Sequence, residues 1–181
     1  MNQYPEIEGI NFSENFRKNM YNFMWQYFNL EVIQDIFYTL GSKEELNIQK
    51  YEGIIKFKKS ICFKGDDKDG HYFYVDKNLK VHGTFESNLL NYETDDGVCH
   101  SIAIIYALKD YLPKYGKLFK ITVNPQTKEQ YKNNYLNILN FYKWLIESKI
   151  WDYVIKYHFP NETVGKCKKA LEFIKEEINK F

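Results

Sequence analysis

The sequence predicts an α+β fold in which a small antiparallel sheet packs on a central, buried helix, with further helices at both ends of the chain. Two runs rich in Tyr, Phe and Val, residues 71–75 and 81–85, are separated by turn residues and predict a β-hairpin. Residues 98–112 are largely apolar on every face and stop before Pro113, which predicts the buried helix. Apolar residues recur at helical spacing on both sides of this central part.

The N-terminal part is predicted to be helical. A first helix has Ser13 as its cap, and its apolar stripe is interpreted as core. A second helix covers residues 31–40 and ends at Gly41, and Ser42 with Glu45 predicts a capping box for a short third helix. The stripe of the first helix consists of Phe12, Phe16, Met20, Phe23, Met24, Tyr27 and Phe28.

Two further strands and three further helices complete the prediction. Residues 54–63 are expected to form one strand and residues 118–123 another, so that the sheet has three or four strands. From residue 127 onward, three apolar stripes predict three helices with a break near Pro160. The stripes are Tyr131, Tyr135, Ile138, Leu139, Tyr142, Leu145 and Ile146; Trp151, Val154 and Ile155; and Val164, Cys167, Leu171, Ile174 and Ile178.

Length and composition indicate a single domain, residues 1–181, with a helical N-terminal extension over 1–50 and a helical C-terminal part over 127–181. The net charge of +1 gives no general attraction to nucleic acids or membrane surfaces, so neither is expected as a partner. The lysines between residues 56 and 64 are interpreted as a solvated strand face. The cysteines lack paired spacing and no signal peptide or transmembrane run is recognisable, which predicts a cytoplasmic protein.

A histidine and a carboxylate flank the predicted hairpin. His71 opens its first strand, and Glu86 follows its second strand. A turn centred between Asn78 and Leu79 puts the histidine opposite the carboxylate, and a turn centred on Lys77 and Asn78 makes them diagonal neighbours. In both registers the two side chains share a face, because strands alternate with period two.

Cys99 lies in the first turn of the predicted buried helix, where unpaired N–H groups and the helix dipole favour a thiolate. A cysteine of lowered pKa, a histidine and a carboxylate that orients the histidine are the components of thiol nucleophilic catalysis. We therefore expect Cys99 to be the nucleophile, His71 the base and then the acid, and Glu86 the residue that orients His71. Asp95 and Asp96 are alternative orienting residues, ranked lower because both suit the cap of this helix.

The order histidine, acidic residue, amide residue, cysteine resembles the ubiquitin-like-protein (SUMO-type) proteases and the related adenovirus-type proteases, and is most similar to short predicted members of this group in large DNA viruses. The motifs that carry the resemblance are His71-Tyr72, Glu86-Ser87, Asn91 and Gly97-Val98-Cys99. The chain departs from the family pattern in two ways: Glu86 stands where Asp is commoner, and no Gln lies between Glu86 and Cys99. Papain-like enzymes place the cysteine before the histidine, so the chain order disfavours them.

The resemblance implies a cysteine protease that cleaves peptide or isopeptide bonds after small residues such as Gly-Gly, in ubiquitin-like conjugates or viral precursors. Asn91, eight residues before Cys99, would then supply the oxyanion-hole amide together with the Cys99 N–H. The resemblance also implies a deubiquitinase-like viral protein that acts on protein substrates in the host cytoplasm or the virion, without a cofactor.

Other interpretations of the same residues stay open. A cysteine on an apolar helix is often a buried core residue. The missing Gln and the acidic residues before Cys99 fit a second hypothesis, a catalytically inactive protease-like binding module or virion structural component. Asp76 is a further acidic candidate, but alternation places it on the face opposite His71. His82 and His100, taken with Cys99 and His71, lack the paired spacing of a metal site, so no metal is expected.

Overall fold

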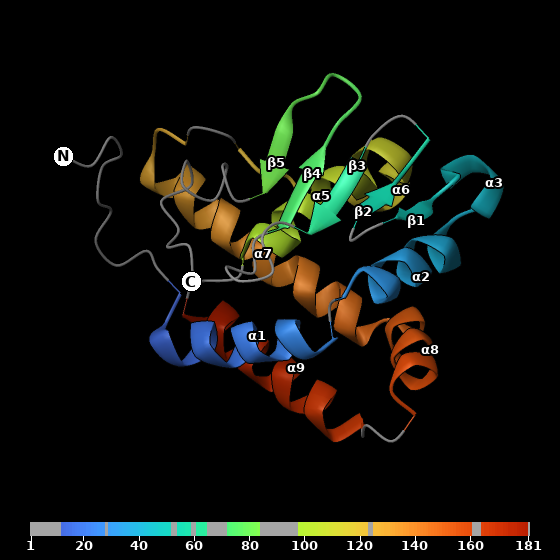
Figure 1. The fold of residues 1–181 in the computed structure, drawn as a ribbon. Helices are drawn as coiled ribbons and strands as arrows, with labels where there is room; N and C mark the ends of the chain where they lie inside the picture. Colours follow the sequence, from blue (N-terminus) through green and yellow to red (C-terminus); the bar gives the residue numbers. More distant parts are fainter. Residues whose placement is uncertain are drawn as a thin grey trace.

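A computed structural model describes residues 12–27, 29–51, 54–58, 61–64, 72–83, 98–122, 125–160 and 164–180. These residues form the predicted mixed α+β structure (Figure 1). The helices are α1 (Glu14–Tyr27), α2 (Leu30–Leu40), α3 (Lys43–Leu46), α5 (Val98–Tyr111), α6 (Pro113–Gly116), α7 (Lys128–Glu147), α8 (Lys149–His158) and α9 (Val164–Asn179). The strands are β1 (Gln49–Tyr51), β2 (Ile54–Lys56), β3 (Ile61–Lys64), β4 (Tyr72–Val75) and β5 (Val81–Gly83).

The five strands form one antiparallel sheet in chain order, β1-β2-β3-β4-β5, where three or four strands were predicted. The predicted single strand over 54–63 is wrong, because the chain folds back between β2 and β3 and pairs Ile54 with Phe63. Phe57, the residue after β2, is 2% exposed and packs into the core, and the next N–H, of Lys58, donates to the Leu46 carbonyl. The Phe57 ring stacks on Tyr111 of α5 at 4.7 Å and meets Phe37 of α2 at 5.2 Å.

The β4–β5 hairpin exists as predicted, but its register differs from both predicted registers. Phe73 pairs with Gly83 and Tyr74 with His82. Each residue of β4 is therefore shifted by one position from its partner in either predicted register. The cause is a loop in which Leu79 adopts a left-handed conformation, with φ at 64°. The predicted shared face of positions 71 and 86 therefore does not follow from the observed pairing.

The predicted strand over 118–123 is also wrong for its described residues, 118–122, which belong to no strand. Side chains of α7 take the place of a neighbouring strand. The Asn134 amide accepts from the Thr122 N–H at 2.8 Å and donates to the Thr122 carbonyl at 3.0 Å. Asn137 donates to the Lys120 carbonyl at 2.6 Å. These bonds satisfy the extended backbone without a ladder.

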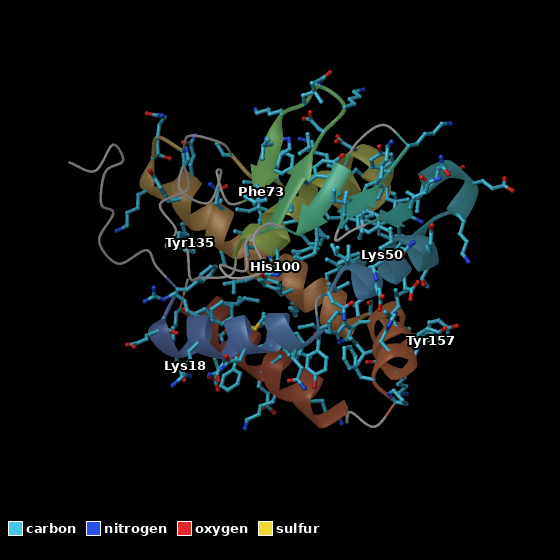
Figure 2. The ribbon with its side chains drawn as sticks, viewed as in Figure 1. Lys18, Lys50, Phe73, His100, Tyr135 and Tyr157 are labelled. Carbon is cyan, nitrogen blue, oxygen red and sulfur yellow. The ribbon has the colours of Figure 1, made fainter. Side chains whose placement is uncertain are left out.

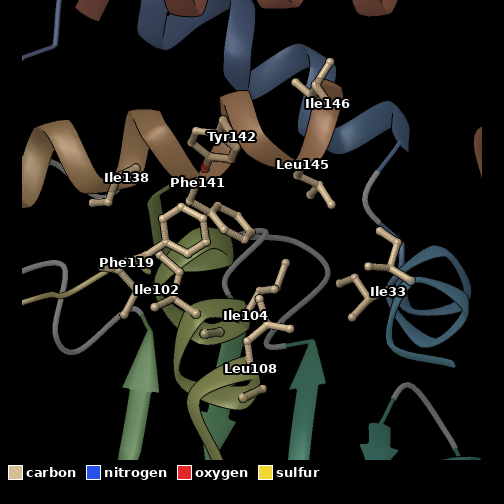
Figure 3. Close-up of a cluster of buried hydrophobic side chains, with 14 of the residues drawn as sticks. Ile33, Ile102, Ile104, Leu108, Phe119, Ile138, Phe141, Tyr142, Leu145 and Ile146 are labelled. Carbon is tan, nitrogen blue, oxygen red and sulfur yellow. The ribbon is translucent and has the colours of Figure 1, made fainter. Parts of the chain in front are cut away.

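Helix α5 lies between the sheet and α7, and this position explains why its residues are apolar on every face. One side of α5 contacts β4 and β5, and the other contacts α7 (Figure 1). Figure 3 shows the second contact, where α5 side chains meet Phe119 and the apolar stripe of α7. The α5 residues Ile102, Ala103, Ile104, Ile105, Ala107 and Leu108 are each at most 4% exposed.

The terminal helices pack on the far side of α7, where α1 and α9 lie side by side (Figure 1). The predicted stripes are buried in α1, α7 and α8, apart from Met24 and Phe28, whose side chains lie outside the description. In α9, Ile174 is buried and Leu171 and Ile178 pack partly against the core, whereas the side chains of Val164 and Cys167 are not among those described. Helical periodicity therefore located these cores correctly.

The helix ends follow the predictions only in part. Ser13 caps α1, since its hydroxyl accepts from the Phe16 N–H at 3.3 Å. Gly41 ends α2 in an extended conformation with φ at −141°, so the position does not need the freedom of glycine. The predicted capping box at Ser42 is wrong, because Ser42 makes no side-chain cap bond. A capping box is present instead at Thr127, which begins α7.

Candidate active site

The residues predicted to carry catalysis sit next to described elements, but their side chains are not described. Cys99 is the second residue of α5, and its side chain lies outside the description. His71, which directly precedes β4, lies wholly outside it, as do Glu86 and Asn91. The structure therefore describes the first turn of α5, which contains Cys99, and the end of the β4–β5 hairpin that His71 precedes in the sequence.

The first turn of α5 is enclosed close to Cys99. The next residue, His100, is 3% exposed, and Ser101 is completely buried. Figure 2 places His100 near the centre of the molecule, below the sheet. Buried polar groups of this kind normally have interaction partners, and neither residue is without one. The backbone of the predicted nucleophile is therefore anchored in a packed part of the helix.

A histidine–carboxylate pair that was not predicted lies within the hairpin itself. His82 Nε2 and Asp76 Oδ2 are 3.0 Å apart, and His82 is 4% exposed. The other Asp76 oxygen accepts from the Asn78 and Lys80 N–H groups, each at 2.9 Å. Asp76, considered as a possible partner for His71, thus orients His82 and shapes the turn. Strand alternation could have indicated this pair, because positions 74, 76 and 82 share one face of the hairpin in the observed register.

Burial and hydrogen bonding act in opposite directions on Asp76. Burial by itself would raise the pKa of the Asp76 carboxyl, because it disfavours the charged form. The hydrogen bond from His82, the two backbone N–H groups of the turn and the charge of His82 outweigh burial. Together they hold the pKa of Asp76 below its ordinary value. Asp76 is therefore a carboxylate at neutral pH and accepts from a protonated Nε2 of His82.

Two side-chain contacts join the hairpin to α5. The His82 ring stacks on the Tyr106 ring with centroids 3.8 Å apart and planes 16° apart. Tyr74, the cross-strand partner of His82, donates its hydroxyl to Asp110 Oδ2 at 2.6 Å. Because Nε2 is engaged and one ring face is covered, His82 serves to hold the hairpin on the helix. It is not placed to act on a substrate.

A second histidine–carboxylate pair fastens α8 to α2. His158 Nε2 lies 2.5 Å from Asp35 Oδ2, which gives His158 the role that the sequence did not indicate. On α2, Glu31 also forms an ion pair with Lys50 of β1. The hydrogen bond from Lys50 and its charge lower the pKa of the Glu31 carboxyl. The half-buried His158–Asp35 pair joins two helices, and the exposed Glu31–Lys50 pair joins a helix to the sheet. Among the described residues, no cluster of three His, Cys, Asp or Glu is arranged to hold a metal ion.

Comparison of the chain with known protein families, with curated proteins and with solved structures finds no match. The resemblance to SUMO-type proteases therefore continues to depend on the residues between His71 and Cys99. Across the described helices, none combines the length and the apolar character that crossing a membrane requires.

Proposed function

We propose that this protein is a cysteine protease that cleaves peptide or isopeptide bonds. Cys99 is the nucleophile, His71 the general base, Glu86 the residue that orients His71, and Asn91 a donor of the oxyanion hole. The observation that carries the proposal is the packing of α5 directly on β4 and β5. This packing joins the strand that follows His71 and the helix that contains Cys99 into one unit.

The hairpin geometry supports the proximity of His71 and Glu86. Gly83, the last residue of β5, pairs with Phe73 near the start of β4. The chain therefore enters β4 and leaves β5 at the same end of the hairpin. His71 directly precedes this end and Glu86 follows it three residues after Gly83.

The position of Cys99 in a 14-residue helix supports its role as nucleophile. The first turn of such a helix has unpaired N–H groups and a positive dipole end, which stabilise a thiolate. In the proposed reaction His71 takes the Cys99 proton, and the thiolate attacks the scissile carbonyl carbon. The Asn91 amide and the Cys99 N–H stabilise the oxyanion. The tetrahedral intermediate collapses, the amine leaves with the proton from His71, and water then hydrolyses the thioester.

The substrate part of the proposal comes from the resemblance: peptides that present Gly-Gly before the scissile bond, as in ubiquitin-like conjugates. The test is cleavage of a fluorogenic peptide panel with P1 residues Gly, Ala, Leu and Lys. We expect cleavage of the Gly-Gly member and its loss in Cys99→Ala and His71→Ala, with circular dichroism unchanged. Cys62→Ser, which changes another cysteine, should cleave normally. Cleavage that survives Cys99→Ala, or no cleavage of any member by the wild type, contradicts the proposal.

An exposed aromatic pair favours a second candidate function, a protein-binding module without catalysis. Tyr153 and Tyr157 lie one turn apart on α8 and are 67% and 73% exposed. Figure 2 shows Tyr157 at the outer side of this helix. Tyrosine is enriched at protein interfaces. If the chain binds ubiquitin without cleaving it, calorimetric titration should show weaker binding for Tyr153→Ser/Tyr157→Ser and unchanged binding for Cys99→Ala. Unchanged ubiquitin affinity in the double variant removes this candidate.

A further inference from the structure

The β4–β5 hairpin is paired with β3 through β4 and packs on α5 through its inner face. β4 has four residues and β5 has three, and β5 is the last strand of the described sheet. Short edge strands are held weakly by their own ladder. The inner face of the hairpin therefore has to supply the contacts that fix its position on the helix, and its central residues are the cross-strand pair Tyr74 and His82.

The two contacts of this pair attach the hairpin at two points of α5. Tyr74 bonds to Asp110, and His82 stacks on Tyr106. Tyr106 and Asp110 are four residues apart, so both lie on the same face of the helix. The ladder between β3 and β4 holds the hairpin in the sheet, and the two attachments act at its interface with α5. Two attachments from different strands fix both its position along α5 and its rotation.

Asp76 completes the second attachment. Its hydrogen bond to Nε2 sets the plane of the His82 ring, and its other oxygen fixes the turn. The ring then meets Tyr106 nearly parallel, at 16°. The hairpin turn therefore contacts His82 through Asp76, and His82 in turn contacts Tyr106 of α5.

Both attachments are close to the proposed catalytic residues. Tyr74 lies about 7 Å along the strand from Tyr72, where β4 begins, and His71 is the residue before Tyr72 in the sequence. Tyr106 is seven residues after Cys99, or about 10 Å along a helix. A displacement of about 1 Å between reacting groups can cost about a hundredfold in rate. A small pivot of the hairpin on α5 would produce such a displacement.

We propose that Tyr74, Asp110, His82, Asp76 and Tyr106 are positioning residues, which hold the strand that follows His71 at a fixed place relative to the first turn of α5. This inference rests on the proposed function, because it assumes that His71 and Cys99 act together. It adds five residues, none in the predicted site, on which the thiolate–imidazolium pair depends.

The test compares paired variants at both ends of the Tyr74–Asp110 bond. Asp110 is exposed, so Asp110→Ala removes the acceptor without touching the core, whereas Asp110→Asn keeps an acceptor oxygen and removes the charge. Tyr74→Phe removes the donor. Its matched control is Tyr38→Phe, which removes a tyrosine hydroxyl bond of the same length, 2.6 Å, to the Ile48 carbonyl.

For each variant, the rate of Cys99 alkylation by iodoacetamide is followed from pH 4 to 9 by peptide mass, beside the melting temperature. We expect Asp110→Ala and Tyr74→Phe to raise the midpoint pH of Cys99 by about one unit, a tenfold loss of thiolate. Asp110→Asn and Tyr38→Phe should keep the wild-type midpoint. The contrast between Asp110→Ala and Asp110→Asn separates lost positioning from a lost charge.

The outcomes separate the two proposals. A low wild-type midpoint that neither Asp110→Ala nor Tyr74→Phe shifts overturns the positioning inference and leaves the proposed function intact. Equal shifts in Asp110→Ala and Asp110→Asn also overturn it, because the charge alone would then explain the effect. A wild-type Cys99 that titrates like a free thiol, at about 8.5, overturns the proposed function itself.

Discussion

Glu177, near the end of the last helix, accepts two hydrogen bonds from Ser13 at the start of the first. Its carboxylate receives the Ser13 backbone N–H at 2.8 Å and the Ser13 hydroxyl at 2.7 Å. In a capping box, the side chain that accepts from the N-cap backbone N–H belongs to the third residue of the same helix. Here it comes from a residue 164 positions away, and it is 2% exposed. The two ends of the described chain are therefore joined at the positive end of the α1 dipole.

We expect Glu177→Ala to lower the free energy of unfolding by about 2 kcal/mol, because it leaves two Ser13 donors without their acceptor. Glu177→Gln should cost less, since one oxygen remains. The matched control is Glu176→Ala, which removes an exposed carboxylate from the neighbouring position. Urea denaturation measures all three. Equal losses for Glu176→Ala and Glu177→Ala would contradict the capping role.

Asp76 makes stability depend on pH in a definite direction. Its pKa is lower in the folded chain than in the unfolded chain, so its contribution is present above the unfolded value of about 3.9. That contribution is lost as the pH falls through the folded value. Asp76→Asn should therefore be less stable than the wild type at pH 7, with the difference shrinking below about pH 4. Urea denaturation at pH 7, 5 and 3 measures this, and a constant difference over that range would contradict it.

The left-handed conformation of Leu79 predicts a stabilising substitution. An L-residue with a side chain is disfavoured by about 1 kcal/mol in this region, and Leu79 is 80% exposed, so little packing is lost without it. Leu79→Gly should raise the free energy of unfolding by about that amount. Leu118→Gly is the matched control, at a leucine 55% exposed but with ordinary backbone, and should destabilise slightly. A loss of stability in Leu79→Gly would indicate contacts of the leucine side chain that outweigh the strain.

Asn134 is expected to matter more than a polar residue of α7 ordinarily would. It is 2% exposed, and Asn134→Ala leaves both backbone groups of Thr122 without their partner. We expect a loss of about 2–3 kcal/mol in the free energy of unfolding. Asn133→Ala, at the exposed neighbouring position, should stay within about 0.5 kcal/mol of the wild type. Similar effects of the two substitutions in thermal or urea unfolding would contradict this account of the 118–122 segment.

Local periodicity was sufficient to predict the long helices and the existence of the hairpin, since burial repeats every 3.6 or 2 residues within one element, but it did not predict the short helix α6. It was also not sufficient where the chain reverses direction. The predicted strand over 54–63 is two strands that pair with each other, and the left-handed Leu79 shifts the hairpin register. The bonds of Asn134 to Thr122 and of Glu177 to Ser13 join distant positions, and such contacts leave no periodic signal.

For the candidate site, sequence reasoning identified the elements that flank His71 and Cys99 but not the contacts that fasten them together. It treated Asp76 as a turn residue and ranked it against Glu86 as a partner for His71. The structure pairs Asp76 with His82 instead, on the face that meets α5. Strand alternation, which placed Asp76 on the face opposite His71, also places Asp76 on the face of His82 in the observed register. The Asp76–His82 pair could therefore have been predicted from alternation once the register was known.

The most direct test of the central claim is the pH dependence of Cys99 alkylation by iodoacetamide in the wild type and in His71→Ala, resolved by peptide mass so that Cys62 and Cys167 serve as internal references. A thiolate–imidazolium pair predicts a wild-type midpoint well below the ~8.5 of a free thiol, and a higher midpoint in His71→Ala. A Cys99 that does not react, or that reacts with an unshifted midpoint in both proteins, would contradict the proposed cysteine protease.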